Sequence, residues 1–159
     1  MLFAALLFAF WVLRLGVPVW PPPLQPRLPV GVTSLNTLVL LASAAAVGAG
    51  IRDGRGGHSV GATRGLAVGA ALGALFIVIQ WYEWIRLVGF GITVTSGTYG
   101  ALFYAVIGMH AIHVVVALTW LLGMLAVSNR NIASLEACAL YWHFVVALWP
   151  VLYVAIYLL

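Results

Sequence analysis

The sequence is poor in charge. It contains no lysine and only three acidic residues beside seven arginines, so that charged residues make up 6% of the 159 positions and hydrophobic residues 65%. A soluble domain of this length turns most of its residues toward water and carries roughly 25% charged residues. The composition therefore excludes a soluble globular fold and indicates an integral membrane protein. The arginines lie singly between apolar runs and form no basic stripe, which argues against a nucleic-acid partner.

Cysteine is almost absent as well. Cys138 is the single cysteine, which excludes an internal disulfide and a metal site made only of thiolates. It lies in an apolar run, where we expect it to pack as a small hydrophobic residue. No serine or cysteine lies beside a base in a pattern typical of nucleophilic catalysis. We therefore predict no catalytic residues in this chain.

Five apolar segments follow one another along the chain, and all but the first reach the roughly 20 residues that cross a hydrocarbon core. The first carries Arg14 near its end, so it spans if that guanidinium reaches the headgroups. We expect this segment to be retained, because no basic residues precede it and a Pro-rich stretch follows it. The sequence predicts an all-α integral membrane bundle of five transmembrane helices, a single transmembrane domain over residues 1–159. The predicted helices are Leu2–Val17, Val30–Ile51, Arg64–Phe90, Gly97–Val127 and Ser134–Leu159.

The arginines also predict an orientation. Three of them lie in the connection over residues 52–64, and Arg130 lies in the connection after the fourth segment, on the same side. The opposite side holds Arg27 and Arg86. The positive-inside rule therefore puts the arginine-rich side in the cytoplasm. With five spans, the N-terminus is cytoplasmic and the C-terminus lies outside.

Small residues recur at helical spacing. Gly65, Gly69 and Gly73 lie four residues apart in the third segment, and Gly100 and Gly108 share a face of the fourth. Small residues at this spacing let two helix backbones approach closely within a membrane. We predict that these five glycines are helix-packing positions.

Six residues at membrane depth are candidates for a polar framework. They are Gln80, Glu83, His110, His113, Trp142 and His143. Polar groups within a span are costly, so each requires a partner or a function. We predict that the histidines bond across helices to Glu83, tyrosine, serine or backbone groups, and that Glu83 pairs with Arg86 one turn away.

Two other classes of protein stay open from the residues alone. A bis-histidine haem site needs histidines on two helices at matching depth, and His110 and His143 meet a crude form of that requirement. Because only three intramembrane histidines exist, and Glu136 is the one carboxylate within two turns of His143, we expect no cofactor and no metal in this chain. A small transporter would show two related halves with broken helices, and no such symmetry is evident.

The polar stretches also carry a family resemblance. In order along the chain, the motifs are Trp20-Pro21-Pro22, Ser34-Leu35-Asn36-Thr37 with Leu40-Leu41-Ala42-Ser43, Gln80-Trp81-Tyr82-Glu83-Trp84, Thr98-Tyr99-Gly100, Gly108-Met109-His110-Ala111-Ile112-His113-Val114, and Tyr141-Trp142-His143-Phe144 with Trp149. This series resembles the successive motifs of cytochrome c oxidase subunit III and covers nearly the whole chain. Some quinol oxidases and nitric oxide reductase systems have relatives of that subunit.

The resemblance implies a non-catalytic structural subunit of a haem-copper terminal oxidase in aerobic electron transport. Such a subunit packs directly on subunit I, associates with subunit II and other oxidase subunits, and binds phospholipid. Haem and copper are then expected in the partner subunits, and the location is the bacterial plasma (inner) membrane. The resemblance also implies that the six framework residues form an intramembrane polar framework with possible lipid contact. The alternative within this resemblance is an accessory membrane subunit of a nitric oxide reductase system.

The chain departs from the family pattern at two acidic positions. Leu2 stands where the family commonly has a buried carboxylate, and Val146 stands where many members have aspartate. The long mitochondrial form has seven helices, and this chain is similar to its last five. Five-helix forms are known among bacterial enzymes. We expect the scaffold role to carry over, whereas a direct proton-conducting role is weakened.

Overall fold

The computed structural model describes residues 2–16, 30–89, 98–127 and 131–158, and every regular element in this part of the chain is a helix. The elements are α1 (Leu2–Leu15), α2 (Val30–Arg55), α3 (Ser59–Gly89), α4 (Thr98–Ala126), α5 (Ile132–Tyr153) and the short π-helix η1 (Val154–Leu158). The fold is therefore all-helical, as predicted, with four long helices and one shorter N-terminal helix.

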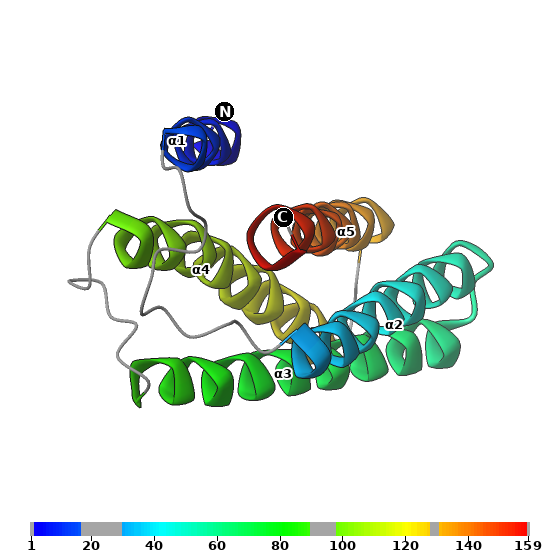
Figure 1. Cartoon of the computed structure of the whole chain (residues 1–159). Coiled ribbons are helices and arrows are strands. Elements are labelled where there is room, and N and C mark those ends of the chain that lie inside the picture. The colour runs from blue at the N-terminus through cyan, green and yellow to red at the C-terminus, as the bar shows by residue number, and fades with distance from the viewer. Residues whose placement is uncertain (1, 17–29, 90–97, 128–130, 159) are drawn as a thin grey trace.

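Helices α2, α3, α4 and α5 form a closed ring (Figure 1). Each packs against the next, α5 closes back onto α2, and the α2–α3 contact is the most extensive. Helix α1 stands outside this ring and packs on α4 (Figure 1). The ring brings residues more than 100 positions apart in sequence side by side, which positions the polar side chains described below.

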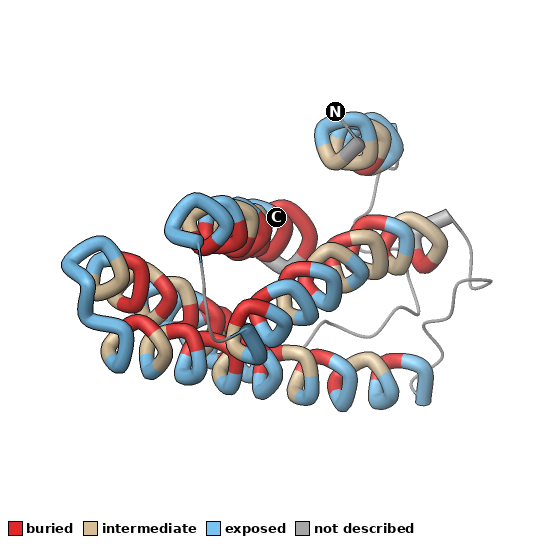
Figure 2. The backbone as a smooth tube through the Cα atoms, turned by 180° about the vertical axis from the view of Figure 1, so that it is seen from behind, coloured by how far each residue is buried: buried red, intermediate tan, exposed pale blue. Residues whose placement is uncertain are grey.

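Burial and hydrophobicity are arranged as in a membrane bundle. Buried residues face the interior of the ring, whereas the outward faces are exposed (Figure 2). Many exposed side chains are large and apolar, for example Leu140 at 74%, Leu35 at 67% and Val78 at 65% exposure. Helices α2 to α5 are each long and apolar enough to cross a membrane. Helix α1 has 14 residues, about 21 Å at a rise of 1.5 Å per residue, and is shorter than the hydrocarbon core.

The helices extend past the apolar segments from which they were predicted. Helix α2 continues from Ile51 to Arg55, and α3 begins at Ser59 instead of Arg64. The predicted connection over residues 52–63 was too long, because charge ends the apolar run and does not end the helix. The turn instead uses Gly57 at φ 78°, and the amide of His58 donates to the Asp53 carbonyl at 2.9 Å. A positive φ at low cost is what glycine provides after a helix C-terminus.

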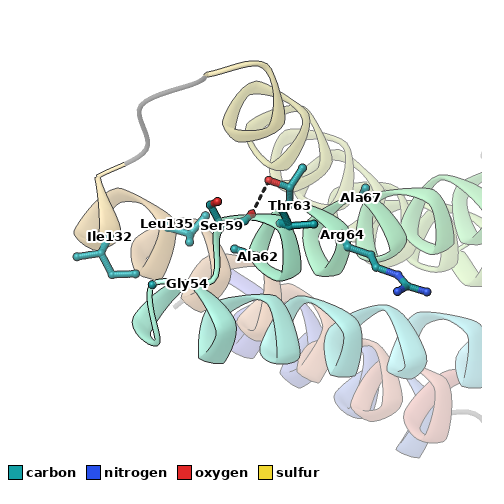
Figure 3. A pocket seen from close by; sticks show the side chains of 10 residues that line it. Gly54, Ser59, Ala62, Thr63, Arg64, Ala67, Ile132 and Leu135 are labelled. Atoms are coloured by element: carbon teal, nitrogen blue, oxygen red, sulfur yellow. Dashed lines mark hydrogen bonds between the residues drawn. The ribbon is translucent and has the colours of Figure 1, made fainter.

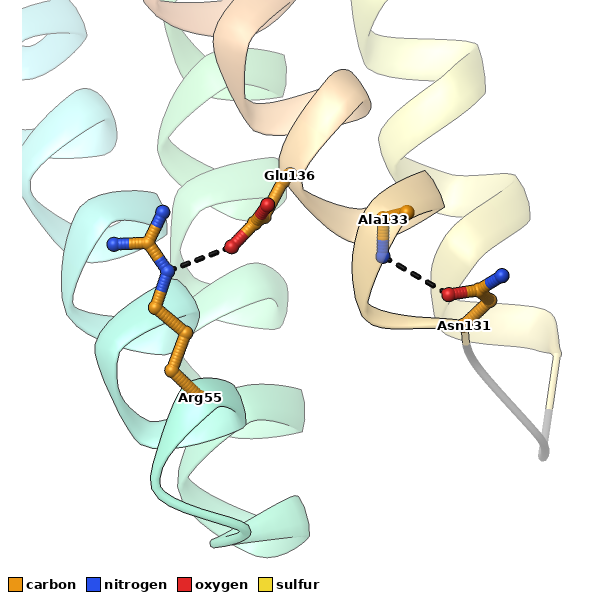
Figure 4. Close-up of polar contacts among 4 residues, drawn as sticks. All are labelled: Arg55, Asn131, Ala133 and Glu136. Carbon is orange, nitrogen blue, oxygen red and sulfur yellow. Dashed lines mark hydrogen bonds and ion pairs between the residues drawn. The ribbon is translucent and has the colours of Figure 1, made fainter.

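The fifth helix begins two residues earlier than predicted. The side chain of Asn131 accepts a hydrogen bond from the amide of Ala133 at 3.0 Å and so caps the helix (Figure 4), as asparagine commonly does at this position. Pro150 lies inside α5, and the last turns form η1. Nearby, Arg55 Nε of α2 donates to Glu136 Oε1 of α5 at 2.7 Å (Figure 4), which joins the C-terminal end of α2 to the first turns of α5.

Candidate functional site

One group of polar side chains joins α2, α3 and α5. Trp142 Nε1 of α5 donates to Ser43 Oγ of α2 at 3.1 Å, and Ser43 Oγ donates to the carbonyl of Gly69 on α3 at 2.8 Å. Ser43 and Trp142 are both fully buried. A single serine hydroxyl therefore links three helices where no water is available to replace it. We call Ser43, Gly69 and Trp142 the three-helix junction.

Gly69 and Gly73, two of the predicted packing glycines, make this junction possible. A Cβ at Gly73 would overlap the six-membered ring of Trp142, and a Cβ at Gly69 would overlap Val47. A Cβ at Gly65 would lie 2.5 Å from the Cα of Gly50 on α2. Because none of these neighbours is the end of a flexible side chain, each glycine lets two elements approach at a distance that alanine does not permit.

The predicted packing positions on α4 are different. Gly100 is buried, but a Cβ at Gly108 would meet no atom within 4 Å. Gly108 therefore has no close helix neighbour in the described part of the chain, and it lines a cavity instead.

A second group lies nearer the N-terminal end of α2 and farther along α5. Trp149 Nε1 donates to Thr37 Oγ1 at 2.9 Å, and that hydroxyl donates to the Thr33 carbonyl at 2.7 Å. The ring of His110 stacks on Trp149, with centroids 5.2 Å apart and an interplanar angle of 26°. Phe76 of α3 meets the same indole edge-on, with centroids 5.1 Å apart. Trp149 thus packs the four ring helices around one side chain.

The other two framework histidines bond within their own helices. His113 Nδ1 lies 2.8 Å from the Met109 carbonyl, and His143 Nδ1 lies 2.6 Å from the Ala139 carbonyl. Each carbonyl is four residues earlier, so both rings donate to the preceding helical turn. Among the described residues, the hydrogen bonds of His113 and His143 therefore stay within their own helices, whereas bonds across helices were predicted. A histidine Nδ1 can donate to the carbonyl four residues earlier in its own helix, so it does not need a partner on a neighbouring helix.

The polar groups of α3 are buried but poorly paired. Glu83 is 3% exposed, and its Oε1 accepts from Arg86 Nη1 at 3.3 Å, which is the predicted pair. Gln80 is 5% exposed, and neither of its amide atoms has a hydrogen-bond partner among the described residues. Trp84 Nε1, and both ring nitrogens of His110 on α4, also have no hydrogen-bond partner among the described residues. Asn36 Nδ2 of α2 donates to the Phe76 carbonyl at 3.1 Å, one turn before Gln80.

No three histidine, cysteine, aspartate or glutamate side chains come together as a potential metal site within the ranges 2–16, 30–89, 98–127 and 131–158. His110 lies under Trp149, whereas His143 bonds to its own helix beside Gly48 of α2. His110, His113 and His143 thus contact an aromatic ring or bond to their own helix, whereas His58 is exposed in the turn after α2.

The arginine-rich end of the bundle holds a cavity of about 770 Å³ (Figure 3). It lies between the first turns of α3 and α5, with Gly54, Ser59 and Ile132 at its margin (Figure 3). Within it, Thr63 Oγ1 donates to the Ser59 carbonyl at 2.9 Å and is therefore occupied (Figure 3). The cavity is open to the surface, and the Thr63 hydroxyl in it is bonded to the first turn of α3.

Sequence reasoning missed the α2 side chains that receive these bonds. Thr33, Thr37 and Ser43 were overlooked as site residues, together with Ser34, whose hydroxyl lies 2.6 Å from the Tyr153 hydroxyl. The repetition of serine and threonine in an otherwise apolar helix could have identified them. Their small hydroxyl groups cost little to bury and can accept hydrogen bonds from indole N–H groups of a neighbouring helix. The motif residues Trp20-Pro21-Pro22, Arg27 and Arg130 lie outside the described residues.

The comparison with known families decides the identity. The family described as "Cytochrome c oxidase subunit III" matches residues 1–159. The chain belongs to the cytochrome c oxidase subunit III family. It is 30% identical to "Cytochrome c oxidase subunit 3" of Synechocystis sp., over 99% of this chain and 70% of that protein. It is also 34% identical to the protein of that name from Ornithorhynchus anatinus, over 87% of this chain and 54% of the relative. It is 33% identical to that from Locusta migratoria, over 98% of this chain and 62% of the relative.

Family membership and the four long apolar helices together make this a multi-pass membrane protein. The chain spans little more than half of the length of several relatives that it matches, and 70% of the Synechocystis protein. Val146, where the resemblance led us to expect an aspartate in many members, is buried at 2% exposure and is part of the apolar interior. The side chain of Leu2, the other departure, lies outside what the structure describes.

Proposed function

We propose that this chain is a non-catalytic structural subunit of a haem-copper respiratory oxygen reductase. It packs directly on subunit I, which carries haem and copper, associates with subunit II and the other oxidase subunits, and binds phospholipid at its surface. The match to the subunit III family over residues 1–159 carries this proposal. The relatives named above are all cytochrome c oxidase subunits, which favours oxygen reduction over an accessory role in nitric oxide reduction.

The contacts of the framework residues support a structural role. Trp142 holds the three-helix junction, His110 stacks on Trp149, and His113 and His143 bond to their own helices. These interactions use the polar groups for helix packing. The redox chemistry of the complex is then the task of the partner subunits.

Deletion of the gene tests this function. We expect the oxidase purified without this chain to keep its haem absorption spectrum and its initial rate of oxygen consumption, and to lose activity faster during turnover. Re-expression of the chain should restore the lifetime. Loss of the haem spectrum on deletion would show that the chain holds a prosthetic group or is required for its insertion, and would contradict a peripheral structural role.

We also propose the orientation given by the arginines, in the bacterial plasma membrane. Arg52, Arg55 and Arg64 lie where α2 ends and α3 begins, and Arg86 lies near the other end of α3. With α1 crossing the membrane, the N-terminus is cytoplasmic and the C-terminus periplasmic. The exposed turn residue His58 offers a test, because His58→Cys in a Cys138→Ser background should react with an impermeant maleimide only in inside-out vesicles. Labelling in intact spheroplasts would reverse the topology.

A further inference from the structure

His143 of α5 has one ring nitrogen that bonds within the chain and one that does not. Its Nδ1 lies 2.6 Å from the Ala139 carbonyl, and a carbonyl oxygen only accepts, so Nδ1 carries the proton. In the neutral ring, Nε2 is then a hydrogen-bond acceptor. Nε2 has no partner among the described residues and, unlike the two ring nitrogens of His110, is not shielded from the surface. The half-buried imidazole therefore presents an acceptor at the surface of the bundle.

This acceptor lies where α2 and α5 meet. A Cβ at Gly48 of α2 would be 3.5 Å from His143 Nε2, so the ring lies against the α2 backbone. About one turn farther from the arginine-rich end, Ala45 of α2 and Ala147 of α5 are exposed. Their small side chains leave both backbones open to a close approach. We call Ala45, Gly48, His143 and Ala147 the α2–α5 seam.

The depth of the acceptor limits what can cover it. Gly48 is four residues before Arg52, about 6 Å along the helix axis. Arg52 is exposed and marks the level at which a guanidinium reaches the headgroups. Below that level a phospholipid offers ester carbonyls and acyl chains, none of which donates a hydrogen bond. Because polar groups inside a membrane span pair with other polar groups, the His143 acceptor requires a donor from another polypeptide.

We propose that a transmembrane helix of subunit I packs in the α2–α5 seam and donates to His143 Nε2 from a serine, threonine, tyrosine or tryptophan side chain. The small residues of the seam let the partner backbone approach closely enough for this bond. The ion pair of Arg55 and Glu136, each seven residues from its seam residue, joins α2 to α5 at the headgroup end of the same faces. This inference rests on the proposed function and adds the face by which the chain is held.

The first test locates the partner helix in the intact purified complex, with the photoreactive residue p-benzoylphenylalanine in place of Ala45. After illumination, we expect mass spectrometry to find the cross-link in a transmembrane segment of subunit I. Val68, on an exposed face of α3, is the matched control position. It precedes Gly69, whose carbonyl accepts from Ser43, so it lies at about the depth of Ala45. From Val68 we expect no cross-link to that segment.

The second test concerns the hydrogen bond itself. His143→Phe keeps an aromatic ring without the acceptor and should weaken retention of this chain by the complex about three- to tenfold in a detergent dilution series. His143→Gln supplies an acceptor again and should restore most of the retention. His113→Phe is the matched control. His113 also bonds to its own helix, but Phe3 of α1 lies against its ring with centroids 5.1 Å apart, so retention should be unchanged.

A double-mutant cycle joins the two tests. Removal of the donor side chain in the cross-linked segment should weaken retention as much as His143→Phe does, and the two changes together should weaken it no more than either alone. Additive losses would show that the two side chains do not bond to each other.

Several outcomes would overturn the proposal. Cross-links from Ala45 to phospholipid alone, to a second copy of this chain or to a segment without a donor side chain would give the seam another occupant. Equal retention of the parent and His143→Phe would indicate that water, or no group, bonds to Nε2. If His143→Phe does not fold, the cross-link and His143→Gln decide. Failure of this chain to co-purify with subunit I would instead contradict the proposed function, and with it this inference.

Discussion

The two sides of α3 differ in whether the buried polar groups have hydrogen-bond partners. Toward α2 and α5, the three-helix junction pairs every donor that it buries: Trp142 donates to Ser43, and Ser43 donates to Gly69. Toward α4, the amide of the buried Gln80 and the shielded Nε1 of Trp84 have no hydrogen-bond partner among the described residues. An indole N–H is therefore bonded on one side of α3 and left unbonded within the described chain on the other. Since an unbonded buried polar group is costly, the first side should contribute more to stability than the second.

The largest effect should come from removing the indole of the junction. Trp142→Ala deletes a fully buried ring and is expected to lower the free energy of unfolding by about 3–5 kcal/mol. Trp120→Ala, at a site that is 42% exposed, should cost much less. Unfolding by sodium dodecyl sulfate in mixed micelles, followed by circular dichroism, measures both. Equal losses would remove the distinction between the junction and the outer surface.

A smaller effect is expected from one added methyl group. In Gly73→Ala the new Cβ overlaps the Trp142 ring, and overpacking of this kind costs about 1–3 kcal/mol. In Gly108→Ala the Cβ meets open space, and the loss of glycine's conformational freedom in the unfolded chain should leave stability unchanged or slightly higher. The same detergent titration compares the two. If Gly108→Ala is the more damaging variant, the space beside Gly108 is closed in the membrane.

A pair of polar-to-apolar changes sharpens the comparison directly. Ser43→Ala leaves the Trp142 N–H without its acceptor and should cost about 1–2 kcal/mol. Gln80→Met removes groups that have no partner among the described residues and should be neutral or stabilising. Melting of the purified chain in detergent checks both. A loss at Gln80 as large as that at Ser43 would mean that Gln80 is bonded within the chain.

The smallest effect belongs to the arginine-rich end. The side chains of Arg55 and Glu136 are 62% and 42% exposed, and exposed ion pairs contribute about 0.2–1 kcal/mol. Arg55→Ala should therefore lower the unfolding free energy by less than about 1 kcal/mol, with the difference shrinking as salt is raised from low ionic strength to about 1 M. A difference independent of salt would indicate that packing, and not charge, holds the two helix ends together.

Much of the fold could be predicted because it follows from the length of apolar runs. The segment from Val30 and the segment ending near Ala126 are helices in the structure, since an apolar run in lipid has to satisfy its own backbone. Residues 52–55 and 59–63 were assigned to a connection because hydropathy detects the hydrocarbon core and not the helix that extends beyond it. The capping residues Gly57 and Asn131 mark the true ends.

The candidate site was predictable only in part. The spacing of Gly65, Gly69 and Gly73 identified a close helix contact, and the structure gives Gly73 a definite neighbour in Trp142. The bonds of His113 and His143 were predicted across helices because a sequence gives the face of a side chain but not its choice between its own helix and the next. Ser43 was not predicted as a site residue, because its hydroxyl does not titrate and the sequence does not show that it links three helices.

One nuclear magnetic resonance experiment tests the difference between the two sides of α3 most directly. The seven tryptophans give separate indole N–H signals in a detergent-solubilised, ¹⁵N-labelled chain. We expect the Trp142 signal to exchange slowly with deuterium and to shift in Ser43→Ala, whereas the Trp84 signal should exchange faster and be unaffected by that change. A Trp142 signal that does not change in Ser43→Ala, or a Trp84 signal as well protected as that of Trp142, would contradict the difference between the two sides of α3.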